Sequence, residues 1–81
     1  MGESKLTVTY GPDELEISSK SAKNVKELRD QVFKVLSIPA EANVQIVHED
    51  GAVEDVKDEE KTAIKPTDKA VNFVKPSGSK N

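Results

Sequence analysis

One segment of helical periodicity lies between segments that alternate like strands, and this contrast limits the folds open to the chain. The apolar residues of the helical segment recur at three- and four-residue spacing, at Val25, Leu28, Val32, Val35 and Leu36. Ser21 is predicted as the N-cap, because its hydroxyl can accept a hydrogen bond from the first turn. Pro39 restricts Ile38 to extended geometry, so the helix is expected to end near Leu36 or Ser37.

The flanking segments alternate apolar and polar residues at the two-residue period of half-buried strands. The expected strands are 5–10, 14–18, 44–48, a short strand around 52–53, and 70–74. Gly11-Pro12-Asp13 has turn chemistry and predicts a hairpin between the first two strands. Residues 55–65 are polar and are expected to wrap the edge as a loop with a short helix, with Val56 and Ile64 turned inward.

Strands combined with one amphipathic helix indicate an α+β layer in which the sheet covers the apolar face of the helix. The first and last strands could pair in parallel at the centre of that sheet. We therefore expect one domain over residues 5–75, with a disordered N-terminus at 1–4 and a flexible tail at 76–81.

Composition excludes several kinds of site. The chain of 81 residues has no cysteine, which excludes disulfides and thiolate metal ligands, and a single histidine, His48, which excludes a multi-histidine site. We therefore predict no metal and no cofactor. The sequence has neither an apolar signal core nor a run of about 20 apolar residues, so we expect a cytoplasmic or nuclear protein without a membrane partner.

Charge and aromatic content argue against nucleic-acid binding. Fifteen acidic and twelve basic side chains give a net charge of −3 and are spread along the chain, whereas nucleic-acid binding needs clustered cations. The only aromatic residues are Tyr10, Phe33 and Phe73, too few for a platform that stacks bases. No spacing places a nucleophile beside His48 in a triad pattern, so we predict a protein that is not an enzyme.

Seven carboxylates lie within twelve residues, at Glu49, Asp50, Glu54, Asp55, Asp58, Glu59 and Glu60. A calcium loop needs regularly alternating oxygen ligands, and Asp50-Gly51-Ala52-Val53 breaks that register. We interpret the cluster as a solvated acidic edge that could steer a basic partner.

The chain resembles the ubiquitin family over roughly Lys5 to Val74. The resemblance is carried by Asn24-Val25-Lys26 early in the helix, Ile38-Pro39 after it, and Ala70 to Val74 as the last strand, with weaker likeness at Val53-Glu54-Asp55 and Ala63-Ile64-Lys65. It implies a ubiquitin-like β-grasp fold, with a mixed four- to five-stranded sheet packed on one amphipathic helix. The interval from the helix to Ile38 is about one helical turn longer than in ubiquitin.

The resemblance also implies a non-catalytic protein-interaction module that binds partners through the outer face of the sheet. The residues carried over to that face are Val47, His48, Asn72 and Val74. The leucine that ubiquitin has in its hairpin loop is missing near Gly11. The implied partners are ubiquitin receptors, proteasome components or chaperone components, bound by a monomer.

Two other functions remain open. The tail lacks the family's Gly-Gly end, but a modifier processed to Gly78 by removal of Ser79 to Asn81 could be conjugated to target proteins. Pro-Ser-Gly-Ser-Lys-Asn is equally typical of a linker or a disordered terminus. Another β-grasp branch would bind through an edge strand, as small-GTPase-binding domains do, although Glu14 and Glu16 argue against a GTPase partner.

Overall fold

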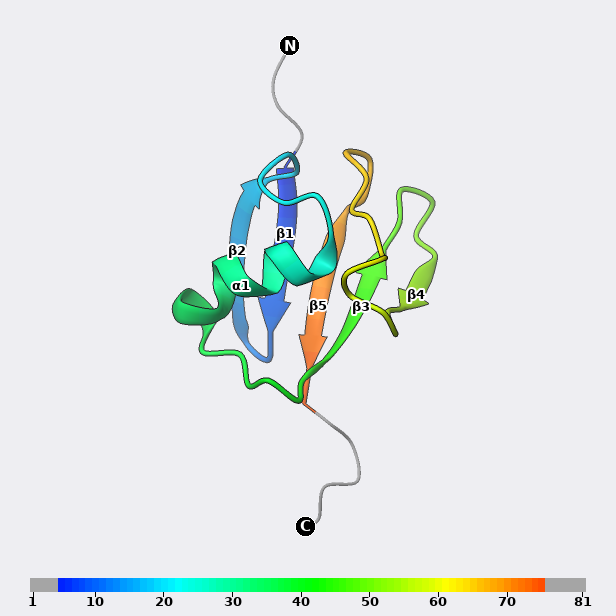
Figure 1. The fold of residues 1–81 in the computed structure, drawn as a ribbon. Helices are drawn as coiled ribbons and strands as arrows, with labels where there is room; N and C mark the ends of the chain where they lie inside the picture. Colours follow the sequence, from blue (N-terminus) through cyan, green and yellow to red (C-terminus); the bar gives the residue numbers. More distant parts are fainter. Residues whose placement is uncertain (1–4, 76–81) are drawn as a thin grey trace.

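Two strands from opposite ends of the chain, β1 (Lys5–Tyr10) and β5 (Ala70–Val74), run parallel and side by side in the sheet (Figure 1). The computed structural model describes residues 5–75. The other elements are β2 (Asp13–Ser18), α1 (Val25–Leu36), β3 (Asn43–Val47) and β4 (Val53–Asp55). The strand order is β2-β1-β5-β3-β4, and α1 crosses one face of the sheet.

This α+β arrangement of one helix on a mixed five-stranded sheet confirms the expected architecture, including the parallel pair at its centre. Strand bounds agree with the sequence patterns to within one or two residues. The expected short helix between residues 55 and 65 was wrong. That segment consists of β4's last residue, turns and an isolated bridge, because its backbone groups pair with the start of α1. Among residues 5–75, no helix has the length and apolar character needed to cross a membrane.

The hairpin between β1 and β2 closes through a two-residue turn at Gly11-Pro12. Gly11 has φ of +61°, which places a glycine at the first central position, as a type II′ turn requires. Pro12 then fixes φ near about −65° at the second position. Tyr10 and Asp13 are therefore directly opposite each other, and the register continues to Lys5 and Ser18.

The core lies between α1 and the helix-facing side of the sheet. Alternate residues of the strands point into the core, and four buried residues of α1 pack against them. The buried core residues of the strands and helix are Leu6, Val8, Val25, Leu28, Val32, Leu36, Val44, Ile46, Val71 and Phe73. Ile64 is also buried and Val56 packs against the core, so both inward anchors expected in the acidic segment are confirmed.

The helix begins later than the sequence pattern indicates. Asn24, not Ser21, is the N-cap, and its Oδ1 accepts from the N–H of Glu27 at 2.9 Å. The segment that follows β4 supplies acceptors for the two preceding N–H groups: Val25 donates to the Thr62 carbonyl at 3.1 Å, and Lys26 to the Glu59 carbonyl at 3.2 Å. Because the first three helical N–H groups are satisfied in this way, this tertiary contact sets the start of α1.

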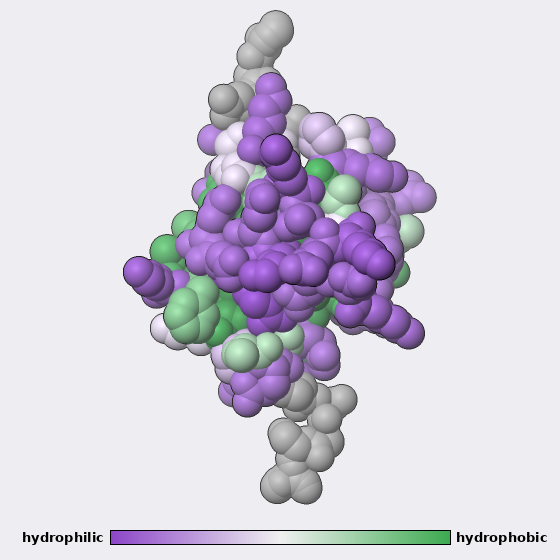
Figure 2. Space-filling model, viewed as in Figure 1, coloured by the Kyte–Doolittle hydropathy of each residue, from purple (hydrophilic) through white to green (hydrophobic). Residues whose placement is uncertain are grey.

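The helix ends at Leu36 with Ser37 as its C-cap, as predicted, but its apolar face is narrower than predicted. Val35 was expected on that face and is 62% exposed, because the C-terminal end of α1 lies beyond the sheet edge formed by β2 (Figure 1). Phe33, on the opposite flank of the same turn, is 50% exposed. The remaining outer surface around α1 is hydrophilic (Figure 2).

Arg29 ties α1 to two loops. Its Nε and one terminal nitrogen donate to both carboxylate oxygens of Glu59, at 2.8 and 2.6 Å. The same terminal nitrogen donates to the Ala42 carbonyl at 2.7 Å, and the other donates to the carbonyls of Pro39 and Ala40 at 3.1 and 3.4 Å. All five guanidinium N–H groups therefore have acceptors.

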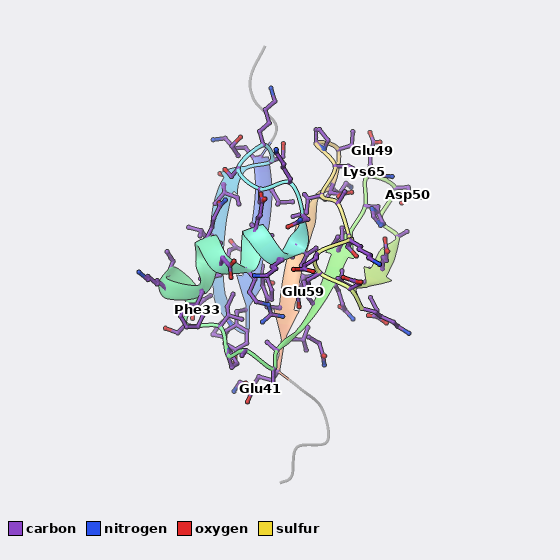
Figure 3. The ribbon with its side chains drawn as sticks, in the orientation of Figure 1. Phe33, Glu41, Glu49, Asp50, Glu59 and Lys65 are labelled. Carbon is purple, nitrogen blue, oxygen red and sulfur yellow. The ribbon has the colours of Figure 1, made fainter. Side chains whose placement is uncertain are left out.

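Arg29 also contacts the core. The centre of its guanidinium lies 5.2 Å from the centre of the Phe73 ring, within the range of a cation–π interaction. Only 13% of its side chain and 29% of the Glu59 side chain are exposed. Glu59 lies at the N-terminal end of α1, over β5 (Figure 3). One side chain thus joins the helix, the connection to β3, the acidic segment and the central strand.

We predict that Arg29→Met lowers the free energy of unfolding by about 2–4 kcal/mol, because it leaves a carboxylate and several carbonyls without their donor. Arg29→Lys should be almost as destabilising, since an ammonium cannot reproduce the fork of five donors. Urea unfolding followed by circular dichroism measures both. The control is Lys26→Met, which breaks an exposed ion pair with Asp30 and should cost at most about 0.5 kcal/mol. Equal losses for Arg29 and Lys26 variants would contradict the prediction.

The helix C-terminus offers a stabilising substitution. Ser37 has φ of 53° and ψ of 47°, the left-handed conformation that glycine adopts without steric cost. Ser37→Gly is expected to raise the free energy of unfolding by about 0.5–1 kcal/mol and the melting temperature by about 2–6 °C. Ser21→Gly is the matched control, because Ser21 has no positive φ. A gain from both variants, or from neither, would show that the left-handed residue is not strained.

Candidate functional site

The sheet face turned away from α1 carries an apolar row across three strands. Val47 of β3 lies opposite Val53 of β4 on one side and opposite Ala70 of β5 on the other. Val53 is 57% exposed, and Val47 and Ala70 are half-buried. Because residues directly opposite each other have side chains on the same face, these three form one surface, which we call the outer apolar row.

The neighbouring row on the same face is polar and internally hydrogen-bonded. Asn72 of β5 lies between Thr9 of β1 and Gln45 of β3, and Gln45 lies opposite Asp55 of β4. The Thr9 hydroxyl donates to Asn72 Oδ1 at 2.8 Å, and Gln45 Nε2 donates to Asp55 Oδ1 at 3.0 Å. These bonds give the outer apolar row a fixed polar border.

Val47 and Val74, the two valines carried over from the resemblance, are not brought together. Val74 is 43% exposed and lies opposite Asn43, four residues along β5 from Ala70, which corresponds to about 13 Å along the strand. Asn72 lies between the two valines and is engaged by Thr9. Val74 instead lines a separate shallow groove of about 380 Å³, together with Val44, Val56, Lys57 and Lys75 among others.

Val53 and Ala70 belong to the outer apolar row but were not predicted as site residues. Each was placed in its strand, but only strand register decides which residues share a row. The Asp50-Gly51 turn contained the signal for Val53: Gly51 has φ of +89°, and the short connection sets Val53 opposite Val47. No comparable local signal sets Ala70 opposite Val47, because β3 and β5 are joined through more than twenty residues.

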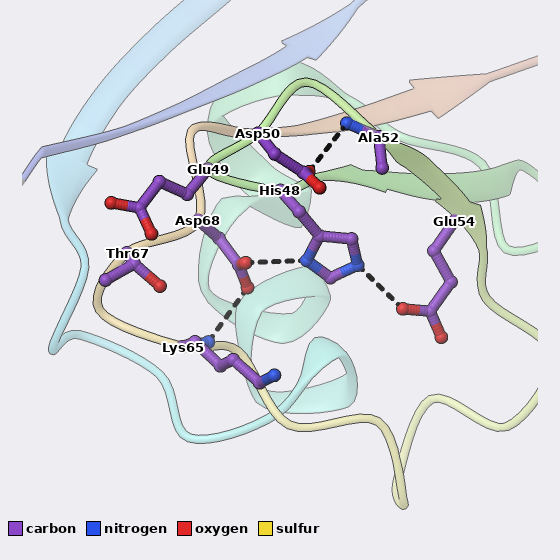
Figure 4. Close-up of a pocket in the computed structure, with 8 residues that line it drawn as sticks. All are labelled: His48, Glu49, Asp50, Ala52, Glu54, Lys65, Thr67 and Asp68. Carbon is purple, nitrogen blue, oxygen red and sulfur yellow. Dashed lines mark hydrogen bonds and ion pairs between the residues drawn. The ribbon is translucent and has the colours of Figure 1, made fainter.

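His48, which follows β3, is held by a carboxylate at each ring nitrogen (Figure 4). Its Nδ1 lies 2.8 Å from Asp68 Oδ1, and its Nε2 lies 2.8 Å from Glu54 Oε1. The Asp68 side chain is 1% exposed, and its second oxygen accepts from the Lys65 N–H at 2.9 Å. His48 thus links the end of β3 to β4 and to the loop before β5.

This arrangement favours the protonated ring. A neutral imidazole has one N–H donor, so one carboxylate would face a nitrogen lone pair, whereas the imidazolium donates to both. The hydrogen bond to Asp68 and then the one to Glu54 raise the pKa of His48 above its ordinary value of 6.5. With both nitrogens engaged, the ring has no free position for accepting a substrate proton, which agrees with a structural role for His48.

The surface around His48 is a shallow hollow of about 420 Å³ (Figure 4). The other charged groups that line it are Glu49 and Asp50 of the β3–β4 turn and Lys65 of the loop before β5. Glu54 and Asp68 approach opposite sides of the ring, so they do not converge on one point. Within residues 5–75, no group of three or more histidine or carboxylate side chains is arranged to hold a metal ion.

Several carboxylates of the acidic cluster make hydrogen bonds or ion pairs that stabilise the fold. Glu59 pairs with Arg29, Glu54 with His48, and Asp55 accepts from Gln45. Asp50 Oδ1 accepts from the Ala52 N–H at 3.0 Å, and Asp58 Oδ1 from the Lys61 N–H at 3.3 Å. Five of the seven carboxylates therefore have partners within the described part of the chain. All but Glu59 are nevertheless exposed, so the acidic edge is solvated, as expected, and is also internally hydrogen-bonded. Gly78, the candidate conjugation residue, lies outside the described residues.

Comparisons with protein-family models and with curated proteins found no match to this chain. We therefore infer the function from the geometry of residues 5–75.

The contacts of His48 with Asp68 and Glu54 predict that the stability of the protein depends on pH. Because the folded-state pKa is raised, the stabilisation is complete below the ordinary pKa of 6.5 and is lost as pH rises through the raised value. The melting temperature should therefore fall between about pH 6 and about pH 9, where carboxylates no longer titrate. His48→Gln should flatten this dependence, and Glu54→Gln should reduce it while leaving the Asp68 contact.

Differential scanning calorimetry across that pH range measures the effect. His48 is the only histidine of the chain, so no second imidazole contributes. A melting temperature that rises with pH, or an unchanged slope in His48→Gln, would contradict the assignment.

Proposed function

We propose that residues 5–75 form a ubiquitin-like β-grasp domain that acts as a non-catalytic protein-interaction module. Two features support the fold: a hairpin precedes the single helix, and the first and last strands pair in parallel at the sheet centre. The sequence resemblance over Lys5 to Val74 points in the same direction.

The observation that carries the functional proposal is the outer apolar row. Its three residues lie on the sheet face that α1 leaves uncovered, and Val53, at its edge, is more than half exposed. An exposed apolar surface with a polar border is typical of protein–protein contact sites. The binding surface thus centres on Val47 and Ala70 and extends to Val53, while Val74 contributes at most from a separate groove.

The expected partner presents an apolar helix or loop to this face, as ubiquitin receptors, proteasome subunits and chaperone components do for ubiquitin-like domains. The row is small, so the affinity should be weak, in the range of about 10–1,000 µM. Glu16 of β2 lies at the far end of the same row, next to Thr7. A basic residue on the partner would find its complement there.

The test is a chemical-shift titration of isotope-labelled protein with a synthetic helical segment of a ubiquitin receptor. Amide shifts should concentrate on Val47, Val53 and Ala70. Val53→Lys should weaken binding about fivefold or more, because it removes about 1 kcal/mol of apolar burial and adds a charge. The matched control is Val35→Lys, an equally exposed valine on the helix, which should bind normally.

Shifts confined to other surfaces at millimolar peptide would refute the outer apolar row as a receptor site. A Val74→Lys variant tests whether Val74 belongs to the same binding surface as Val47, as the resemblance implies. If it weakens binding as much as Val53→Lys, the surface extends over the polar row. If it binds normally, the surface is the row alone.

A further inference from the structure

The short edge strand β4 is held in the sheet mainly by hydrogen bonds. Its three residues are all exposed, and none of them belongs to the buried core. The strand pairs with β3, and the backbone bond from the Val56 N–H to the Val44 carbonyl, at 3.0 Å, continues this pairing. A segment with little apolar burial and exposed backbone hydrogen bonds opens locally at a lower free energy than the core does.

His48 links this strand to the rest of the domain, with a carboxylate at each ring nitrogen (Figure 4). The two carboxylates differ in exposure. The Asp68 side chain, in the loop before β5, is 1% exposed, whereas the Glu54 side chain, in β4, is 53% exposed. The other charged groups that line the hollow around the ring are Glu49 and Asp50 of the β3–β4 turn and Lys65 of the loop before β5. Among these groups within residues 5–75, Asp68 and Glu54 are the two that bond the ring.

Loss of the ring proton affects the two contacts unequally. A neutral imidazole keeps one N–H donor, and its other nitrogen presents a lone pair. If the donor were lost at Nδ1, a buried oxygen of Asp68 would have no donor, because burial keeps water from replacing it. Glu54 is exposed and accepts from water instead. The remaining proton therefore stays on Nδ1, and the Nε2 lone pair then faces the Glu54 carboxylate, so this contact is the one that breaks.

We propose that protonated His48 holds β4 in the sheet and that loss of its proton opens β4 together with the β3–β4 turn. Opening disturbs the outer apolar row, because Val53 directly precedes Glu54 and pairs with Val47. The row is complete only while β4 is paired, so a partner that binds there opposes the opening and in turn binds less tightly as β4 opens. This consequence for binding rests on the proposed function, whereas the opening of β4 does not.

The pH range of the opening follows from the direction of the pKa shift. The hydrogen bond to Asp68 and then the one to Glu54 raise the pKa of His48 above its ordinary value of 6.5. The Glu54 contact exists only while β4 is closed, so the closed strand binds the proton more tightly than the open strand. Closure is therefore favoured most at and below pH 6.5 and weakens as the pH rises through the raised value.

The experiment measures amide hydrogen exchange of isotope-labelled protein at about pH 6 and about pH 8.5, corrected for the intrinsic exchange rate at each pH. The informative amides are those of His48 and Val56, whose backbone hydrogen bonds flank β4. We expect their protection to fall about two- to fivefold at the higher pH, the effect of one exposed ion pair. Low concentrations of urea should change this protection little, because opening of β4 exposes little surface.

Two matched variants separate the hydrogen bond from the charge. In Glu54→Gln the side-chain amide donates to the neutral ring and its carbonyl accepts from the protonated ring, so β4 should be equally protected at both pH values. Glu49→Gln removes the same charge from the hollow but no bond to the ring, and it should keep the full pH dependence of the wild type.

A helical peptide of a ubiquitin receptor, without histidine and with capped ends, tests the consequence for binding. At about ten times its Kd it should slow exchange of the His48 and Val56 amides about tenfold, because it binds the form in which β4 is closed. Peptide binding that leaves this exchange unchanged would contradict the link between β4 and the outer apolar row.

Three further results would overturn the proposal. Unchanged protection of His48 and Val56 between the two pH values would mean that the proton does not hold β4. A loss of protection that Glu49→Gln suppresses as much as Glu54→Gln would assign the effect to overall charge, and a loss that grows steeply with urea would assign it to unfolding of the whole domain. If the peptide binds at no pH, the proposed function fails, while the exchange of the free protein still decides the role of His48.

Discussion

The contact between Arg29 and Glu59 is the constraint on which the remaining structure depends. The acidic segment after β4 has few apolar residues, and Ile64 and Val56 are its anchors in the core. Arg29 holds this segment against α1 with a two-point ion pair, and the carbonyls of Glu59 and Thr62 then accept from the first helical N–H groups. The Arg29–Glu59 salt bridge therefore also determines the first residue of α1 and the path of the chain back to β5.

Local sequence patterns predicted the helix and the strands, but they did not predict which contacts the connecting segments make with them. The two-residue alternation of Lys5–Tyr10 and Ala70–Val74 predicted both central strands with their observed bounds, because side-chain alternation is a property of the strand itself. The N-cap was misplaced at Ser21, since Asn24 is selected by a bridge to Ala63 and by the Glu60 carbonyl, 36 residues away. Arg29 was not singled out at all, as an isolated arginine on a helix does not reveal its partner 30 residues later.

The same limit applies to the candidate site. Val47 and Ala70 were each assigned to the correct strand, yet their meeting depends on the register between β3 and β5, which a long connection sets. A slip of two residues preserves every inward and outward assignment and changes every row. The resemblance grouped Val47, Asn72 and Val74, and the observed register places Ala70 opposite Val47 and moves Val74 to the end of the strand.

The two edge strands of the sheet, β2 and β4, limit further strand pairing in different ways. The β4 edge is three residues long, and its Glu54 and Asp55 are held by His48 and Gln45. The β2 edge is six residues long, carries exposed Glu14 and Glu16, and lies under the apolar end of α1. Edge charges of one sign suppress pairing between identical chains. Glu14 and Glu16 on β2 therefore disfavour pairing of that edge with a second copy of the chain.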